Sequence, residues 1–162
     1  MNIHPAVVHF PVALLTLYCV MELLWFMNFS KKDYWFATKF ILLLVGTVFA
    51  ELAVKTGELA EIEVGKTPLT QLHSSFGNYV VYFFCFLLVI YLIAIKEKRQ
   101  VQKNNLWNSV SKFSEFIRQP LIISLLSLIG ITLIFITGAL GGAIAYGPSI
   151  DPTVTFVYNL FF

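Results

Sequence analysis

Charged side chains are scarce in this sequence. Lysine, arginine, aspartate and glutamate make up 12% of the 162 residues, whereas hydrophobic residues make up 58%. An average soluble domain has about a quarter of its residues charged, so this composition excludes an ordinary soluble domain. The mean hydropathy of +0.79 is that of an integral membrane protein.

Cysteine is also rare, and the sequence contains no internal repeat and no low-complexity segment. The two cysteines, Cys19 and Cys85, both fall inside apolar runs. We expect them to fill apolar space instead of forming a disulfide or a thiolate site. The net charge of +2 arises from a few basic connections and gives no indication of nucleic-acid binding.

Long apolar runs, in contrast, are abundant. Four stretches, at residues 5–27, 35–56, 68–95 and 120–146, reach the roughly 20 helical residues that a hydrocarbon core requires. They lack the period-two alternation of membrane β-strands. The sequence therefore predicts an all-α protein whose single transmembrane domain, residues 1–162, is an up-down-up-down four-helix bundle. Because the N-terminus carries no basic segment and no small-residue cleavage site, we expect the first stretch to be a retained span.

The basic residues predict how the bundle is oriented. Nine of the eleven lie in or beside two connections, and they are Lys31, Lys32, Lys39, Lys96, Lys98, Arg99, Lys103, Lys112 and Arg118. Basic connections face the cytoplasm. We therefore expect a multi-pass protein of a bacterial inner membrane, with both termini and the loop 57–67 in the periplasm.

Two segments outside the spans also carry apolar residues. In the segment before the fourth span, five apolar residues recur at helical spacing: Leu106, Trp107, Val110, Phe113 and Ile117. This spacing predicts an interfacial amphipathic helix that anchors the cytoplasmic side. The aromatic tail 153–162 is too short to cross the bilayer, and we expect it to lie in the outer interface or to contact another subunit.

The three histidines lie near the starts of the first and third spans. Pro5 suits the first position of a helix, which places His4 outside the helix as a cap and His9 four residues further in. The Thr-Pro pair at 67–68 repeats this arrangement, and His73 follows it. At about 1.5 Å of rise per residue, His9 and His73 lie roughly 6 to 8 Å from their helix starts. We therefore expect these two imidazoles to face each other across the bundle.

Small residues accompany both histidines. Ala13 follows His9 by four residues and Gly77 follows His73 by four, while Gly138 and Gly142 of the fourth span have GxxxG spacing. A small residue one turn below an imidazole leaves a slot into which a flat macrocycle fits. Close helix packing in lipid is the alternative explanation for the same residues.

Two facing imidazoles, with no cysteine or carboxylate to complete a tetrahedral set, suit haem iron better than zinc. We therefore expect a b-type haem held by His9 and His73, in a protein that transfers electrons and catalyses no bond chemistry. Two alternatives stay open. One is a non-redox accessory or scaffold subunit, and the other is a copper or zinc site formed by His4, His9, His73 and Glu51.

Three charged residues in the spans have candidate partners. Glu51 lies close to the histidine level, where its carboxylate accepts a hydrogen bond from a ligand imidazole or pairs with Lys55 at i+4. Glu22 and Lys39 lie at similar depth near the cytoplasmic ends of the first two spans. An unpaired charge there is costly, so we expect them to form a buried or half-buried ion pair.

These motifs also resemble a known family. The sequence HPAVVHFP at the start of the first span, the lone His73 near the start of the third, and GALGG at the end of the fourth resemble the bacterial membrane family catalogued as domain of unknown function 2231. The resemblance implies an electron-transfer setting, because members occur fused to Rieske-type or c-type cytochrome modules. It points to His4, His9 and His73 as the motif histidines. Because neither module is present here, we expect the electron partner, such as a c-type cytochrome, to be a separate chain. After Gly142 the chain reads AIAYGPSI, which departs from the GGxLVY-like close of the family.

Overall fold

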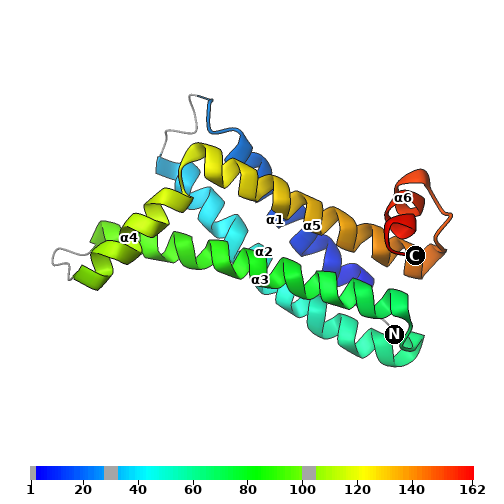
Figure 1. Cartoon of the computed structure of the whole chain (residues 1–162). Helices are drawn as coiled ribbons and strands as arrows, with labels where there is room; N and C mark the ends of the chain where they lie inside the picture. The colour runs from blue at the N-terminus through cyan, green and yellow to red at the C-terminus, as the bar shows by residue number, and fades with distance from the viewer. Residues whose placement is uncertain (1–2, 28–32, 100–104) are drawn as a thin grey trace.

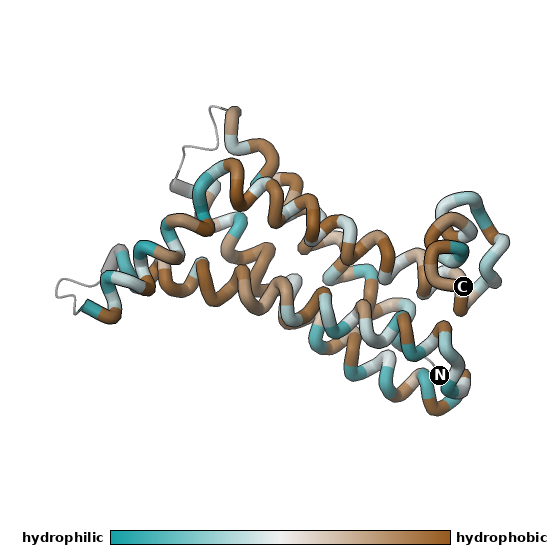
Figure 2. Tube along the Cα trace, in the orientation of Figure 1, coloured by the Kyte–Doolittle hydropathy of each residue, from teal (hydrophilic) through white to brown (hydrophobic). Residues whose placement is uncertain are grey.

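The computed structural model describes residues 3–27, 33–99 and 105–162. Its helices are α1 (His4–Leu23), α2 (Asp33–Val64), α3 (Pro68–Arg99), α4 (Asn105–Ile117), α5 (Pro120–Tyr146) and α6 (Pro152–Phe161). The all-α prediction is confirmed. Four of these helices, α1, α2, α3 and α5, are long and apolar enough to cross a membrane. Figure 2 shows hydrophobic residues through their middle and hydrophilic residues gathered toward the two ends of the molecule.

The four long helices pack as a ring around one core. α1 lies beside α2 and α5, and α3 also lies beside α2 and α5, so that α1 and α3 are diagonal neighbours (Figure 1). The core is filled by large apolar side chains from several of these helices, among them Leu15, Tyr18, Leu43, Phe84 and Leu87. This arrangement brings the start of α1, the end of α2, the start of α3 and the end of α5 together at one end of the ring.

The helix α2 is longer than the sequence predicted. The connection expected at 57–67 is helical as far as Val64, because residues 58–64 are mostly good helix formers and a single interior glycine costs only about 1 kcal/mol. The helix ends at Gly65, whose φ of +92° suits glycine and whose N–H donates to the carbonyl of Glu61 at 2.8 Å. The expected cap of α3 is confirmed, since Thr67 Oγ1 accepts from the backbone N–H of Thr70 at 3.1 Å.

The C-terminal tail forms a helix that folds back onto its own chain. Val154 and Val157 of α6 are buried, and the ring of Phe161 lies 5.5 Å from that of Phe76 in α3. One side of α6 thus packs on its own chain, while Phe156, Leu160 and Phe162 remain exposed, and the expected contact with the outer interface or another subunit stays a prediction. Asp151 makes the reversal possible because its Oδ1 caps α6, accepting from the backbone N–H groups of residues 153 and 154.

Candidate functional site

The structure brings His73 together with His4 and not with His9. The ring centroids of His4 and His73 are 6.1 Å apart, and their planes meet at 81°. The His9 side chain is exposed, and its Nδ1 lies 2.6 Å from the carbonyl of Pro5 in its own helix. The prediction that His9 faces His73 is therefore wrong, as is the prediction that His4 lies outside α1 as a cap, since α1 begins at His4 and its N-cap is Ile3.

The register of α1 explains this exchange. Five residues along a helix turn a side chain by about 140°, so His4 and His9 cannot both face the core. The buried residues Pro11, Leu15, Tyr18 and Glu22 recur at spacings of three and four. Extending that stripe back by seven residues from Pro11 reaches His4. Because nearly every side of α1 is apolar, hydropathy does not reveal this stripe; packing against the other helices does, and it identifies His4 as the interior histidine.

His4 is held by the end of α2. Its Nδ1 lies 3.2 Å from Thr56 Oγ1, and that hydroxyl donates its proton to the carbonyl of Ala53 at 3.0 Å. The hydroxyl must therefore accept from an Nδ1–H of His4, which fixes the tautomer of the neutral ring. The backbone of Gly57 lies against the same imidazole, because a Cβ placed there would be only 3.1 Å from His4 Cε1.

His73 is held in the same manner by the end of α5. Its Nδ1 lies 3.0 Å from the carbonyl oxygen of Thr137, which can only accept, so Nδ1 carries the proton here too. Gly141 lies against this ring, since a Cβ at that position would be 3.1 Å from His73 Cε1. Each of the four helices thus contributes to the site.

This shared tautomer has a chemical consequence. With Nδ1 protonated and bonded to an oxygen of a neighbouring helix, the lone pair of each neutral imidazole lies on Nε2. That is the arrangement in which protein histidines ligate metals, with the partner of Nδ1 fixing the ring's orientation. We name His4, His73, Thr56, Thr137, Gly57 and Gly141 the histidine-pair site. The supporting residues were missed in the sequence, because they lie on α2 and α5 and reach the histidines only through packing between helices.

The small residues predicted to lie beneath the histidines lie elsewhere. Ala13 and Gly138 are exposed, and a Cβ on Gly138 would meet nothing within 4 Å. A Cβ on Gly77 would approach only Val54, at 3.7 Å. Gly142 packs against α6, 3.2 Å from Val154. Each imidazole rests on a glycine of a neighbouring helix, and the alternative of close helix packing describes Gly142. A slot for a macrocycle beneath the histidines stays a prediction.

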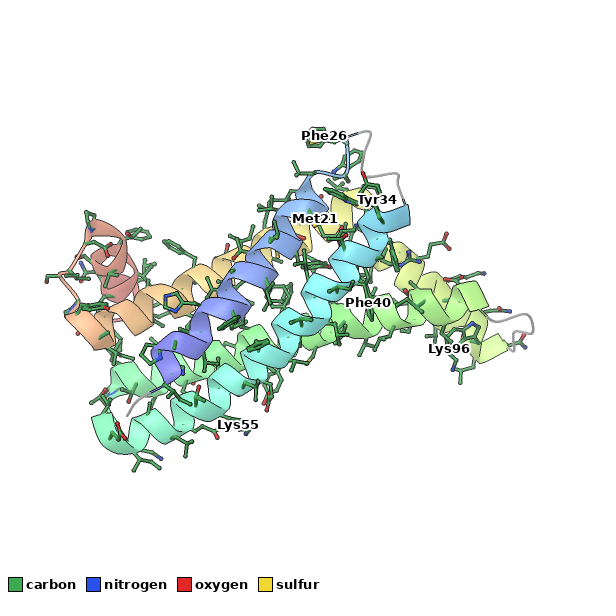
Figure 3. The ribbon with its side chains drawn as sticks, turned by 180° about the vertical axis from the view of Figure 1, so that it is seen from behind. Met21, Phe26, Tyr34, Phe40, Lys55 and Lys96 are labelled. Atoms are coloured by element: carbon green, nitrogen blue, oxygen red, sulfur yellow. The ribbon has the colours of Figure 1, made fainter. Side chains whose placement is uncertain are left out.

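Glu51 does not approach the histidines. Its side chain is half exposed, and its Oε1 lies 3.9 Å from Lys55 Nζ, which is the i+4 pairing considered as the alternative. Figure 3 shows Lys55 on the outer side of α2, directed away from the bundle. Among residues 3–27, 33–99 and 105–162, no three His, Cys, Asp or Glu side chains gather as a metal site. The four-residue copper or zinc site therefore does not form.

A second polar cluster lies at the opposite end of the ring, and here the sequence prediction is confirmed. Lys39 Nζ lies 2.6 Å from Glu22 Oε2, and the Glu22 side chain is only 2% exposed. The Tyr91 hydroxyl donates to Glu22 Oε1. The aromatic ring of Phe36 stacks on Tyr91 with 5.1 Å between centroids. The cluster joins α1, α2 and α3 through one carboxylate.

Comparison with known families identifies the chain. Residues 1–151 match the family described as "Predicted membrane protein (DUF2231)". The chain belongs to this family. This match confirms the resemblance drawn from the sequence motifs and, with the four apolar helices, makes this DUF2231 member a multi-pass membrane protein. Comparisons with curated proteins and with solved structures give no match.

Proposed function

We propose that this DUF2231 protein is a b-type cytochrome, or the haem-carrying subunit of an electron-transfer complex, in which His4 and His73 are the axial ligands. The proposal keeps the haem predicted from the sequence and replaces His9 by His4. One observation carries it. The two imidazoles come from diagonal helices, they share one tautomer, and their centroids are 6.1 Å apart.

That separation matches a pair of axial ligands. Imidazole nitrogens lie about 2 Å from a bound metal ion, so two imidazoles on opposite sides of one ion have ring centres roughly 6 Å apart. The centroid distance of 6.1 Å between His4 and His73 is close to this spacing. A haem bound there supplies one-electron chemistry. The chain's own residues hold and orient it, since Thr56 and Thr137 fix the two rings and Gly57 and Gly141 provide the space beside them.

The alternative function is that of a non-redox accessory or scaffold subunit. It is favoured by the fact that hydrogen bonds from Nδ1 to Thr56 and to the carbonyl of Thr137 also satisfy a purely structural histidine. Pigment in the purified protein separates the two functions.

The setting that we propose follows from the basic connections. The four spans cross a bacterial inner membrane up, down, up and down, and both termini lie in the periplasm. The histidine-pair site is then close to the periplasmic surface, because it lies at the end of the ring opposite the basic connections. Its electron partner is another membrane or periplasmic redox subunit, such as a c-type cytochrome.

Visible spectroscopy of three histidine variants tests the assignment. We expect the purified wild-type protein to show a low-spin Soret band, and His4→Ala and His73→Ala to lose it or to become high-spin. His9→Ala is the matched control and keeps the low-spin spectrum, because its ring is exposed. A colourless wild-type protein from haem-replete cells refutes the cytochrome, and a low-spin His4→Ala protein refutes this choice of ligand.

A further inference from the structure

The short helix α4 presents different residues to the bundle and to its surroundings. Ser111 and Ser114 are buried, and Ser114 Oγ donates to the carbonyl of Ile90 in α3 at 3.0 Å. These small side chains allow α4 to lie close to α3. The face of α4 that contacts its own chain is therefore mainly a serine face.

The apolar residues of α4 lie on another side. Leu106, Val110, Phe113 and Ile117 follow one another at spacings of four, three and four, which places them in one stripe about a quarter-turn or more from the two serines. The side chain of Leu106 is 74% exposed and that of Phe113 is 52% exposed. The opposite sector carries Asn108, Lys112 and Glu115, all exposed. Within the described part of the chain, Leu106 and Phe113 are left largely uncovered, whereas Val110 and Ile117 are partly buried.

The position of α4 indicates what covers it. α4 lies between the end of α3 and the start of α5, both of which are membrane-crossing helices, so it is tethered at the level of the membrane surface. Figure 1 shows it at the end of the bundle away from α6. A helix with an apolar stripe, held at that level, fits the boundary between headgroups and acyl chains. Lipid is already present there, whereas a protein partner would have to be recruited.

The charge around α4 indicates which lipids. Residues 96–118 contain six basic and two acidic side chains. Lys96 Nζ lies 4.7 Å from the centre of the Trp107 ring, beside the junction of α3 and α4 that Figure 3 displays. Lys112 is exposed on the polar sector, while Arg118 is engaged with Glu97 at 3.8 Å. Lysines beside an inserted stripe attract anionic headgroups.

We propose that α4 is an anionic-lipid-binding element that inserts the stripe Leu106, Val110, Phe113 and Ile117 among the acyl chains and directs Lys112 and Lys96 at phosphate headgroups. This function is independent of the haem. It makes the placement of the α3–α5 connection depend on the composition of the leaflet that it faces.

Spin-label accessibility in vesicles tests the proposal with the full chain. Labels are placed by Phe113→Cys and Leu106→Cys on the stripe, with Asn108→Cys as the matched control on the polar sector, each with Cys85→Ala; Cys19 is fully buried and stays. All three labelled positions are exposed, so the fold tolerates them. Each protein is reconstituted in phosphatidylcholine with or without phosphatidylglycerol. Collisions with lipid-soluble oxygen are compared with those of a water-soluble nickel chelate.

We expect the stripe labels to favour oxygen and the 108 label to favour nickel, with the contrast increasing when phosphatidylglycerol is present. Lys112→Glu shifts the stripe labels toward the nickel-accessible value. Nickel access at positions 106 and 113 in every vesicle overturns the insertion. Shielding from both reagents overturns it in favour of a protein partner or a second copy. Insertion that responds to neither phosphatidylglycerol nor Lys112→Glu overturns the anionic specificity.

Discussion

The two threonines of the histidine-pair site hold their imidazoles through different atoms. Thr56 uses its side-chain hydroxyl, whereas Thr137 uses its backbone carbonyl and donates its own hydroxyl to Leu133 at 2.7 Å. The same residue type therefore has unequal consequences when it is replaced. A substitution of Thr56 removes one hydrogen-bond partner of His4, and a substitution of Thr137 leaves the carbonyl that accepts from His73 in place.

This difference gives a paired prediction at the residue scale. We expect Thr56→Val to weaken haem retention by about 10- to 100-fold, the effect usual for the partner of a ligating histidine. It also raises the reduction potential, because an imidazole that has lost the Thr56 hydroxyl as a hydrogen-bond partner is a weaker electron donor to the oxidised iron. Thr137→Val is the isosteric control and changes neither quantity. Titration of the apoprotein with haem measures haem retention, and redox potentiometry measures the reduction potential. Equal effects of the two substitutions contradict the assigned contacts.

At the scale of the helices, α1, α2 and α3 meet at Glu22, at the end of the ring opposite the histidine-pair site. Glu22 of α1 receives Lys39 of α2 and the hydroxyl of Tyr91 of α3. A buried ion pair adds little net stability, but an unpaired buried charge is costly. The cluster therefore constrains how the three helices are arranged more than it stabilises them.

We expect Glu22→Gln alone to lower the free energy of unfolding by about 3 to 5 kcal/mol, because it leaves the Lys39 ammonium without a counter-charge in a mostly buried position. The double substitution Glu22→Gln with Lys39→Met recovers most of this loss, since both charges are then absent. Thermal unfolding in detergent compares the four proteins as a double-mutant cycle. Strictly additive losses show that the pair is not coupled and contradict the prediction.

The helix α6 depends on the cap that Asp151 provides. Hydrogen bonds from the Thr153 hydroxyl and from the backbone N–H groups of Val154 and Thr153 lower the pKa of the Asp151 carboxyl below its usual value of 3.8. A group with a lowered pKa in the folded state stabilises that state above the usual pKa and loses this contribution as the pH falls through the lowered one. The attachment of α6 is therefore expected to weaken only in acid.

The expected result is that protease cleavage within residues 152–162 increases when the pH falls below about 4. Asp151→Asn keeps a good cap without a titrating group, so its cleavage is the same on both sides of that pH. Asp151→Ala is cleaved readily at every pH. All three proteins are treated with the same acid-stable protease at each pH. If the Asn variant shows the pH response of the wild type, the Asp151 carboxylate is not the cause.

At the scale of the whole molecule, hydropathy and charge predicted the membrane class and the position of each long helix. The fourth span, predicted at 120–146, coincides with α5, and the Glu22–Lys39 pair formed as predicted. The site was predicted only in part. His73 is in it, but the choice between His4 and His9 depended on the register of the whole buried stripe of α1. Thr56 and Gly141 belong to the histidine-pair site because of packing between helices, and no local pattern within one span encodes that packing.

The arrangement of the helices supports a prediction about orientation. The basic residues 31–39 and 96–118 are far apart in sequence, yet the structure places the helix ends that carry them together, because Glu22, Lys39 and Tyr91 meet there and Ser114 reaches Ile90 nearby. The histidine-pair site lies at the other end. Both basic connections therefore face one compartment, which the positive-inside rule assigns to the cytoplasm.

We accordingly expect alkaline phosphatase fused after Phe162 to be active and green fluorescent protein fused there to be dark, since the first folds outside the cytoplasm and the second inside. Fusions truncated at residues 100–104, inside the basic connection 96–118, give the opposite pair of results. Adding lysines beside Gly65, at the α2–α3 turn, lowers the activity of the C-terminal phosphatase fusion, because it reduces the charge difference between the two ends. A fluorescent C-terminal fusion places the histidine pair near the cytoplasm and reverses the side from which an electron partner approaches.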